Sequence, residues 1–180
     1  DNNGNWGIDK NTSNVHTIPL RYNTGDYYGL GKATRDGYNF DGWWTEKEGG
    51  TQVWGSNGGA INNGTYWTIE NNAWVWRNDA KDGEIKVYAH WKPANEKVTV
   101  DPNGGVILGL RKNVTKTEEY QFGKEYNVGS DFLNNYSVER PGYTLVGWST
   151  NANASSGSWT YTVPSSDSTI YAIWSKNSGD

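Results

Sequence analysis

Apolar positions along this chain fall in short runs that alternate with polar positions, and glycine, asparagine, aspartate and serine separate the runs. A two-residue period is that of a strand with one buried face, and β-branched and aromatic residues dominate the runs. We therefore predict strands at 98–102, 118–122, 143–150, 159–163 and 169–174. No segment keeps a helical period over several turns, and we expect one short helical turn at 130–136, capped by Ser130 or Asp131. The predicted fold class is mainly β, α+β at most.

The most aromatic stretch, residues 62–79, has the pattern of a β-hairpin. Asn71 and Asn72 lie between two alternating runs, and a two-residue hairpin turn needs positive φ values, which asparagine tolerates. That turn would place Glu70 opposite Ala73, Ile69 opposite Trp74, Thr68 opposite Val75 and Trp67 opposite Trp76. Because side chains alternate across a strand, one face would carry Trp67, Ile69, Trp74 and Trp76, and the other Tyr66, Thr68, Val75 and Arg77.

The chain is an internal duplication, a feature that decides how the rest of the sequence is interpreted. RDGYNFDGWWT at 35–45 matches RPGYTLVGWST at 140–150, and KVYAHW at 86–91 matches TIYAIW at 169–174. We therefore predict two small β units followed by a short tail, with bounds of 1–92, 95–176 and 177–180.

The first unit is the longer of the two. Trp54 and Tyr88 are 34 positions apart, whereas the matching Trp159 and Tyr171 are 12 apart. The difference of 22 residues indicates an insertion in the first unit, at about 55–84, which contains the predicted hairpin.

Three segments of the second unit, VTVDPNGG at 98–105, RPGYTLVGWST at 140–150 and TIYAIW at 169–174, together resemble the Listeria–Bacteroides repeat, the family that includes internalin-type B repeats. The second unit covers that pattern throughout. The first unit matches its latter half, and we expect its first strand to be shortened or to precede Asp1. The resemblance implies small β-grasp-like units that occur in tandem in bacterial surface or secreted proteins.

The duplication also separates two classes of aromatic residue. Rings at matched positions in both units are expected to serve the fold as core or half-buried packing. They pair as Tyr38 with Tyr143, Trp43 with Trp148, Trp54 with Trp159, Tyr88 with Tyr171, and Trp91 with Trp174. Two glycine pairs, Gly37 with Gly142 and Gly42 with Gly147, are expected to permit turns or close packing. Rings that only the first unit carries need another reason; they are Trp6, Tyr27, Tyr28, Trp44, Tyr66, Trp67, Trp74 and Trp76.

Composition and charge exclude several partners. The chain has 11 tryptophans but only 34% hydrophobic residues, so its cores must be built largely from rings, each of which buries roughly 150–250 Å². The net charge is -4 without a basic cluster, which excludes nucleic acid as a partner. No apolar run reaches the roughly 18 residues of a membrane span. A chain without Cys or Met, rich in Asn, Gly, Thr and Trp, favours export, and we expect an extracellular or bacterial cell-surface location.

Surplus rings beside polar side chains point to binding of a polysaccharide or oligosaccharide. A sugar ring stacks its C–H face on an indole or phenol, while amides and charged groups hydrogen-bond its hydroxyls; the scale, taken by analogy from bases, is about 1–3 kcal/mol per platform. The candidate rings are Trp67, Trp74, Trp76, Tyr66, Trp44 and Tyr28, and the candidate rim residues are Asn63, Arg77, Asn78, Asp79 and Lys81.

An α-glucan such as starch or a maltooligosaccharide is the favoured glycan. Trp74 and Trp76 would lie about 7 Å apart along a strand, and the twist of a hairpin would angle the two rings to suit a curved chain. The Trp-rich insertion also resembles carbohydrate-binding modules of bacterial starch-adherence proteins.

Other readings of the same residues stay open. The Trp face of the hairpin would instead pack onto the domain, since an isolated hairpin is marginally stable. A structural spacer or a protein-binding adhesin repeat fits the second unit, and a protein partner would also use exposed rings as anchors. A glycosidase needs two carboxylates about 5–10 Å apart, and nothing in the sequence singles out such a pair. His16 and His90 lack partners for a metal or a triad, so we expect no catalysis, no metal and no cofactor.

Overall fold

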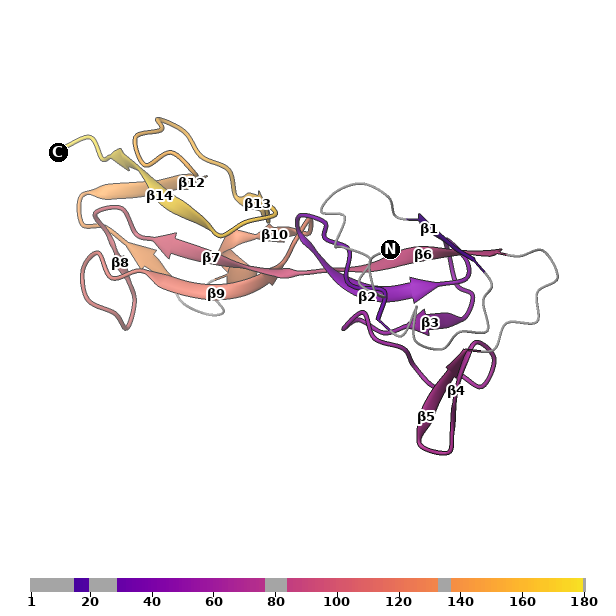
Figure 1. The fold of residues 1–180 in the computed structure, drawn as a ribbon. Coiled ribbons are helices and arrows are strands. Elements are labelled where there is room, and N and C mark those ends of the chain that lie inside the picture. Colours follow the sequence, from indigo (N-terminus) through magenta and orange to yellow (C-terminus); the bar gives the residue numbers. More distant parts are fainter. Residues whose placement is uncertain (1–14, 20–28, 77–83, 133–136, 180) are drawn as a thin grey trace. The chain divides into compact units, whose positions relative to one another are not determined.

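The structure is a computed structural model that describes residues 15–19, 29–76, 84–132 and 137–179. The chain divides into a first unit, Asp1–Lys92, and a second unit, Pro93–Asp180. Nearly all regular structure in the described residues is β (Figure 1). The predicted mainly β class is therefore confirmed.

The first unit contains a four-stranded sheet in the order β1-β6-β2-β3. These strands are β1 (Val15–Pro19), β2 (Tyr38–Trp44), β3 (Gln52–Trp54) and β6 (Glu84–Pro93). The insertion adds a separate two-stranded sheet, which is described with the candidate site. Both β1 with β6 and β2 with β3 pair antiparallel.

The second unit contains a mixed four-stranded sheet in the order β12-β14-β7-β9. It is built from β7 (Asn95–Asp101), β9 (Lys116–Gln121), β12 (Tyr143–Ser149) and β14 (Ser168–Lys176). The central strands β7 and β14 run parallel, whereas both outer pairs are antiparallel. The slot that β7 fills beside β14 is filled in the first unit by β1, which runs antiparallel to β6.

Short elements complete the second unit. β8 (Val106–Ile107) pairs with β11 (Val138–Glu139), and β10 (Glu125–Asn127) pairs with β13 (Thr160–Thr162). One helical turn, Val128–Phe132, follows β10. This turn begins two residues before the predicted helical segment, whose last four residues lie outside the described part of the chain.

The cap of this helical turn differs from the prediction. The side-chain oxygen of Asn127 accepts hydrogen bonds from the N–H groups of Gly129 and Ser130, at 3.1 and 3.3 Å. The carboxylate of Asp131 reaches back and accepts from the N–H of Asn127 at 2.7 Å. Asn127 is therefore the cap, because the turn starts early enough for its amide to reach the first free N–H groups.

The cores of the two units differ in kind. The first is dominated by the indoles of Trp43, Trp54, Trp67 and Trp76, all at most 1% exposed. The second is mostly aliphatic and closes around the rings of Phe132 and Trp148 together with Val98, Val100, Ile107, Val128, Val163, Ile170 and Ala172. Surplus rings in the first unit therefore serve, in part, as core.

Gly42 and Gly147 lie at matched bends where the backbone approaches another strand closely. Both have positive φ, at 93° and 129°. A Cβ on Gly42 would lie 2.3 Å from the carbonyl oxygen of Trp54, and one on Gly147 would lie 2.5 Å from the backbone of Gly157. The expectation of close packing at this pair is confirmed.

We predict that Gly147→Ala destabilises the second unit by about 3 kcal/mol, because backbone strain and overpacking each cost about 1–3 kcal/mol. Gly142→Ala is the matched control. Gly142 also has a positive φ, 79°, but a Cβ there would meet nothing within 4 Å, so it should cost about 1–2 kcal/mol. Urea unfolding of the full chain measures both, and equal costs would contradict the close approach.

Tyr120 links β9 to the helical turn and gives a pH-dependent prediction. Its hydroxyl donates to the carboxylate of Glu118 at 2.8 Å and to the carbonyl of Phe132 at 3.0 Å. Burial, and secondarily Glu118, raise the pKa of the phenol well above its usual range. The unfolded phenol ionises near pH 10 while the folded one keeps its proton, so the free energy of unfolding should fall above about pH 10. Tyr120→Phe should weaken that fall, and parallel pH curves for the two proteins would contradict the assignment.

Candidate functional site

The inserted hairpin forms in the predicted register. β4 (Trp67–Glu70) and β5 (Ala73–Trp76) pair antiparallel, with Trp67 opposite Trp76 and Ile69 opposite Trp74. The turn residues Asn71 and Asn72 have φ values of 50° and 61°. Both central residues are thus left-handed, as a two-residue hairpin turn requires. The turn chemistry and the side-chain alternation were sufficient to predict this element.

Trp67 and Trp76, the inner pair of the hairpin, are buried. Their exposed fractions are 0% and 1%, and both pack on Trp54 of β3. The ring of Trp76 stacks on that of Trp54 at 5.5 Å and 26°, and the ring of Trp67 meets it edge-on at 6.2 Å and 78°. Sugar-stacking roles predicted for Trp67 and Trp76 are not compatible with this burial. These two rings instead fasten the insertion to the first unit.

Trp74 and Ile69, the outer pair on the same face, remain accessible. Trp74 is half-buried, and the edge of Trp67 supports it at 6.1 Å and 90°. Ile69 is 49% exposed. The Trp-bearing face of the hairpin is therefore buried at the base and accessible to solvent near the turn.

Asn63 organises the chain just before β4. Its side-chain oxygen accepts hydrogen bonds from the N–H groups of Thr65, Tyr66 and Trp67, at 2.8–3.2 Å. Its amide nitrogen donates to the carbonyl of Gln52 at 2.9 Å. Because both ends of the amide hold backbone, Asn63 fixes the hairpin to β3, and its role in sugar binding stays a prediction.

The ring of Tyr66 packs against the hairpin. It is half-buried, and its ring lies 5.8 Å from that of Trp76 at an angle of 31°. The accessible part of this ring and Trp74 are the aromatic surface that the inserted segment keeps open to solvent.

Trp44 has a partner that its counterpart in the second unit lacks. Its ring stacks on His90 at 4.5 Å and 6°, and its indole N–H donates to the carbonyl of Asp41 at 2.8 Å. His90 in turn contacts the carbonyl of Glu46 at 2.8 Å. One face of Trp44 is therefore occupied, which leaves at most the other face of this half-buried ring for a ligand.

Matched positions in the second unit explain this stack. Ser149 stands where the first unit has Trp44, and Ile173, which is 2% exposed, stands where it has His90. Both positions of the stack therefore differ between the units, and the aromatic pair of the first unit stands where the second has a serine and a buried isoleucine.

The remaining candidates lie outside the described residues. They are Tyr28, Arg77, Asn78, Asp79 and Lys81. Their roles in binding stay predictions.

Trp159 was expected to serve the fold as a core or half-buried ring, and this expectation is wrong. Trp159 is 49% exposed, whereas Trp54 is fully buried. In the first unit Trp43 pairs with Trp54, but in the second Trp148 bridges to Ser158, one residue earlier. A one-residue shift in register moves side chains to the opposite face, so Trp159 faces solvent. The equal sequence spacing of the two tryptophans concealed this shift.

A family model described as the Listeria-Bacteroides repeat domain matches residues 8–66 and 97–173. The chain belongs to the Listeria–Bacteroides repeat family. The first match ends directly before β4, so the Trp hairpin lies outside both matched ranges of the repeat.

Among curated proteins, the repeats are similar to a protein of Evansella cellulosilytica named "Putative membrane protein". The identity is 27% over 117 residues, which cover 61% of this chain and 16% of that protein. No solved structure matches the chain. Within the described part of the chain, no helix has the length and apolar character needed to cross a bilayer, and no group of three or more His, Asp or Glu side chains is placed to hold a metal ion.

We predict that Trp76→Ala destabilises the first unit by about 3–5 kcal/mol, the usual cost of removing a buried large ring. Trp159→Ala is the matched control, because that ring is exposed in the second unit, and it should change stability by less than about 0.5 kcal/mol. Urea unfolding followed by circular dichroism measures both. A Trp76→Ala protein as stable as the parent would contradict the anchoring role.

Proposed function

We propose that this chain is a non-catalytic carbohydrate-binding module in which the inserted hairpin presents Trp74 to a glycan. The observation that carries the proposal is that one face of the hairpin has a buried half and an accessible half. Its inner rings, Trp67 and Trp76, are buried and anchor the hairpin, while Trp74 stays accessible and packs edge-on against Trp67. A ring that is both fixed and accessible loses little conformational entropy when a ligand stacks on it.

The surroundings of Trp74 suit a sugar better than a purely apolar ligand. Asn71 and Asn72 are exposed in the turn that lies next to Trp74 in the hairpin. Ile69, directly opposite, adds an apolar patch that would contact C–H groups. Side-chain amides beside a ring offer both the donors and the acceptors that sugar hydroxyls need.

We retain an α-glucan, starch or a maltooligosaccharide, as the proposed ligand. The resemblance of the Trp-rich insertion to modules of starch-adherence proteins supports this choice. The angled pair of Trp74 and Trp76 no longer does, because Trp76 is buried. Tyr66 and the open face of Trp44 are the other described rings that belong to the proposed surface.

We further propose an extracellular or bacterial cell-surface location for the protein that carries these repeats. The membrane-protein name of the similar Evansella protein supports it, although the chain spans only 16% of that protein. A glycan-binding module would there hold a larger surface or secreted protein against its polymer.

The second candidate function is a spacer or a protein-binding adhesin repeat. The second unit favours it, since it lacks the hairpin and belongs to a repeat that is duplicated in tandem. A protein partner would use Trp159 as its anchor, because an exposed indole is a frequent hot spot of interfaces.

Trp74→Ala separates these functions. On affinity gels containing starch, β-glucan, xylan or mannan, the parent chain should be retarded by starch, and Trp74→Ala should bind it roughly tenfold more weakly, within the 1–3 kcal/mol of a stacking platform. Trp159→Ala, an equally large truncation in the other unit, should bind starch as the parent does. A spacer would show no retardation in any gel and no change in tryptophan fluorescence with soluble maltoheptaose, and these two results together would sink the carbohydrate proposal.

A further inference from the structure

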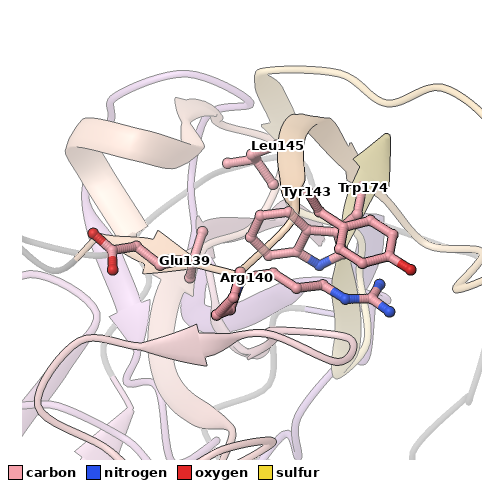
Figure 2. Close-up of a pocket in the computed structure, with 7 residues that line it drawn as sticks. Glu139, Arg140, Tyr143, Leu145 and Trp174 are labelled. Carbon is pink, nitrogen blue, oxygen red and sulfur yellow. The ribbon is translucent and has the colours of Figure 1, made fainter. Parts of the chain in front are cut away.

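A pocket of about 310 Å³ opens on the second unit, far along the sequence from the inserted hairpin (Figure 2). Its apolar walls are Val138 of β11, Leu145 of β12, and Pro141 from the connection between these two strands. A volume at the low end of the usual 300–1,000 Å³ of small-molecule sites fits one ring rather than an extended oligomer.

Trp174 gives the pocket a fixed aromatic wall. Its indole N–H donates to the carbonyl of Pro102 at 2.9 Å. The ring also lies so close to the turn after β7 that a Cβ on Gly105 would come within 2.6 Å of it. The indole is thus held by a hydrogen bond and by contact with backbone, and it is half-buried.

Arg140 gives the pocket a positioned set of donors. Its guanidinium carbon lies 3.7 Å from the centre of the Tyr143 ring, which fixes the plane of the group and leaves its edges for hydrogen bonds. Arg140 forms no ion pair with any described residue. Glu139 also lines the pocket, but Figure 2 shows its carboxylate pointing away from Arg140, Tyr143 and Trp174, so Arg140 is the charged group that faces the ring of Trp174.

The first unit shows how the same position is filled when it is packed by the protein itself. Arg35 lies over Tyr38 at 4.3 Å, as Arg140 lies over Tyr143. Phe40, however, stands where the second unit has Leu145, and its ring packs edge-on against Trp91 at 5.7 Å and 66°. The cation–ring pair therefore belongs to the repeat, whereas the room beside Trp174 comes from the smaller Leu145.

We propose that this pocket is a second glycan site, which takes one neutral pyranose residue against Trp174, with Arg140 donating hydrogen bonds to its hydroxyls. The proposal rests on the proposed carbohydrate function but uses a different unit and different residues. The sugar's C–H face meets Trp174 and Leu145, and its hydroxyls, which can accept hydrogen bonds, meet the donors of the Arg140 guanidinium. We take the sugar to be neutral because the α-glucan proposed for the hairpin is neutral, and a uronic acid is the charged alternative that the test includes.

The test follows the indole N–H resonance of Trp174 in the full chain by NMR during titration with neutral trisaccharides (maltotriose, cellotriose, xylotriose and mannotriose) and with trigalacturonate. At least one neutral trisaccharide should shift that resonance. Leu145→Phe, which restores the packing of the first unit, and Arg140→Gln should each weaken that response at least tenfold. Arg35→Gln, which removes the equivalent cation–ring pair from the first unit, is the matched control and should leave it unchanged.

The outcomes separate this site from the hairpin site. If the Trp174 response persists in Trp74→Ala, the pocket binds independently, as proposed, even if the hairpin proves not to bind. No shift at Trp174 with any neutral sugar, a response insensitive to both pocket variants, a response lost in Trp74→Ala, or tighter binding of trigalacturonate would each overturn the proposal. A loss of starch binding in Trp74→Ala without any shift at Trp174 would leave the hairpin function standing and remove the pocket alone.

Discussion

The stacking of Trp76 on Trp54, with Trp67 edge-on beside them, is the contact on which the first unit depends. A hairpin of two four-residue strands is not stable alone, and here its inner rings complete a core that β2, β3 and β6 leave unfinished. The insertion is therefore part of the unit's architecture rather than an appendage. Only because the inner pair is sealed can the outer pair be held rigidly enough to act as a surface.

The two units solve the same packing problem with coupled substitutions. Where the first has Trp44 against His90, the second has Ser149 beside the buried Ile173. Where the first fills the space beside Trp91 with Phe40, the second leaves an opening beside Trp174. Close-packed interiors respond to changes of one ring by changing a neighbour, so positions that differ in pairs mark where each unit has been specialised.

Some of this structure was predictable from sequence and some was not. The Asn71–Asn72 turn and the alternating pattern gave the hairpin register, because both are local properties of the chain. Alternation says which side chains share a face but not how much of that face another strand covers, so the burial of Trp67 and Trp76 could not be separated from exposure. The outward position of Trp159 could not be predicted for a related reason: its spacing matches that of Trp54, but the backbone pairs Trp43 with Trp54 and Trp148 with Ser158, a difference that sequence spacing does not record. The pocket beside Trp174 depends on two segments, residues 138–145 and Trp174, that only the fold brings together.

The pairing direction of the strands at the ends of each unit has a mechanical consequence. β7 opens the second unit and β14 closes it, and they run parallel, from Val98 opposite Ser168 to Asp101 opposite Tyr171. Tension applied at the two ends of that unit slides the strands along each other and loads all their hydrogen bonds at once. In the first unit, the start of β1 and the end of β6 lie at the same end of an antiparallel ladder, so tension between them breaks the bonds one after another. Under tension, the second unit would thus resist by shear, whereas the first unit would unzip at its β1–β6 edge.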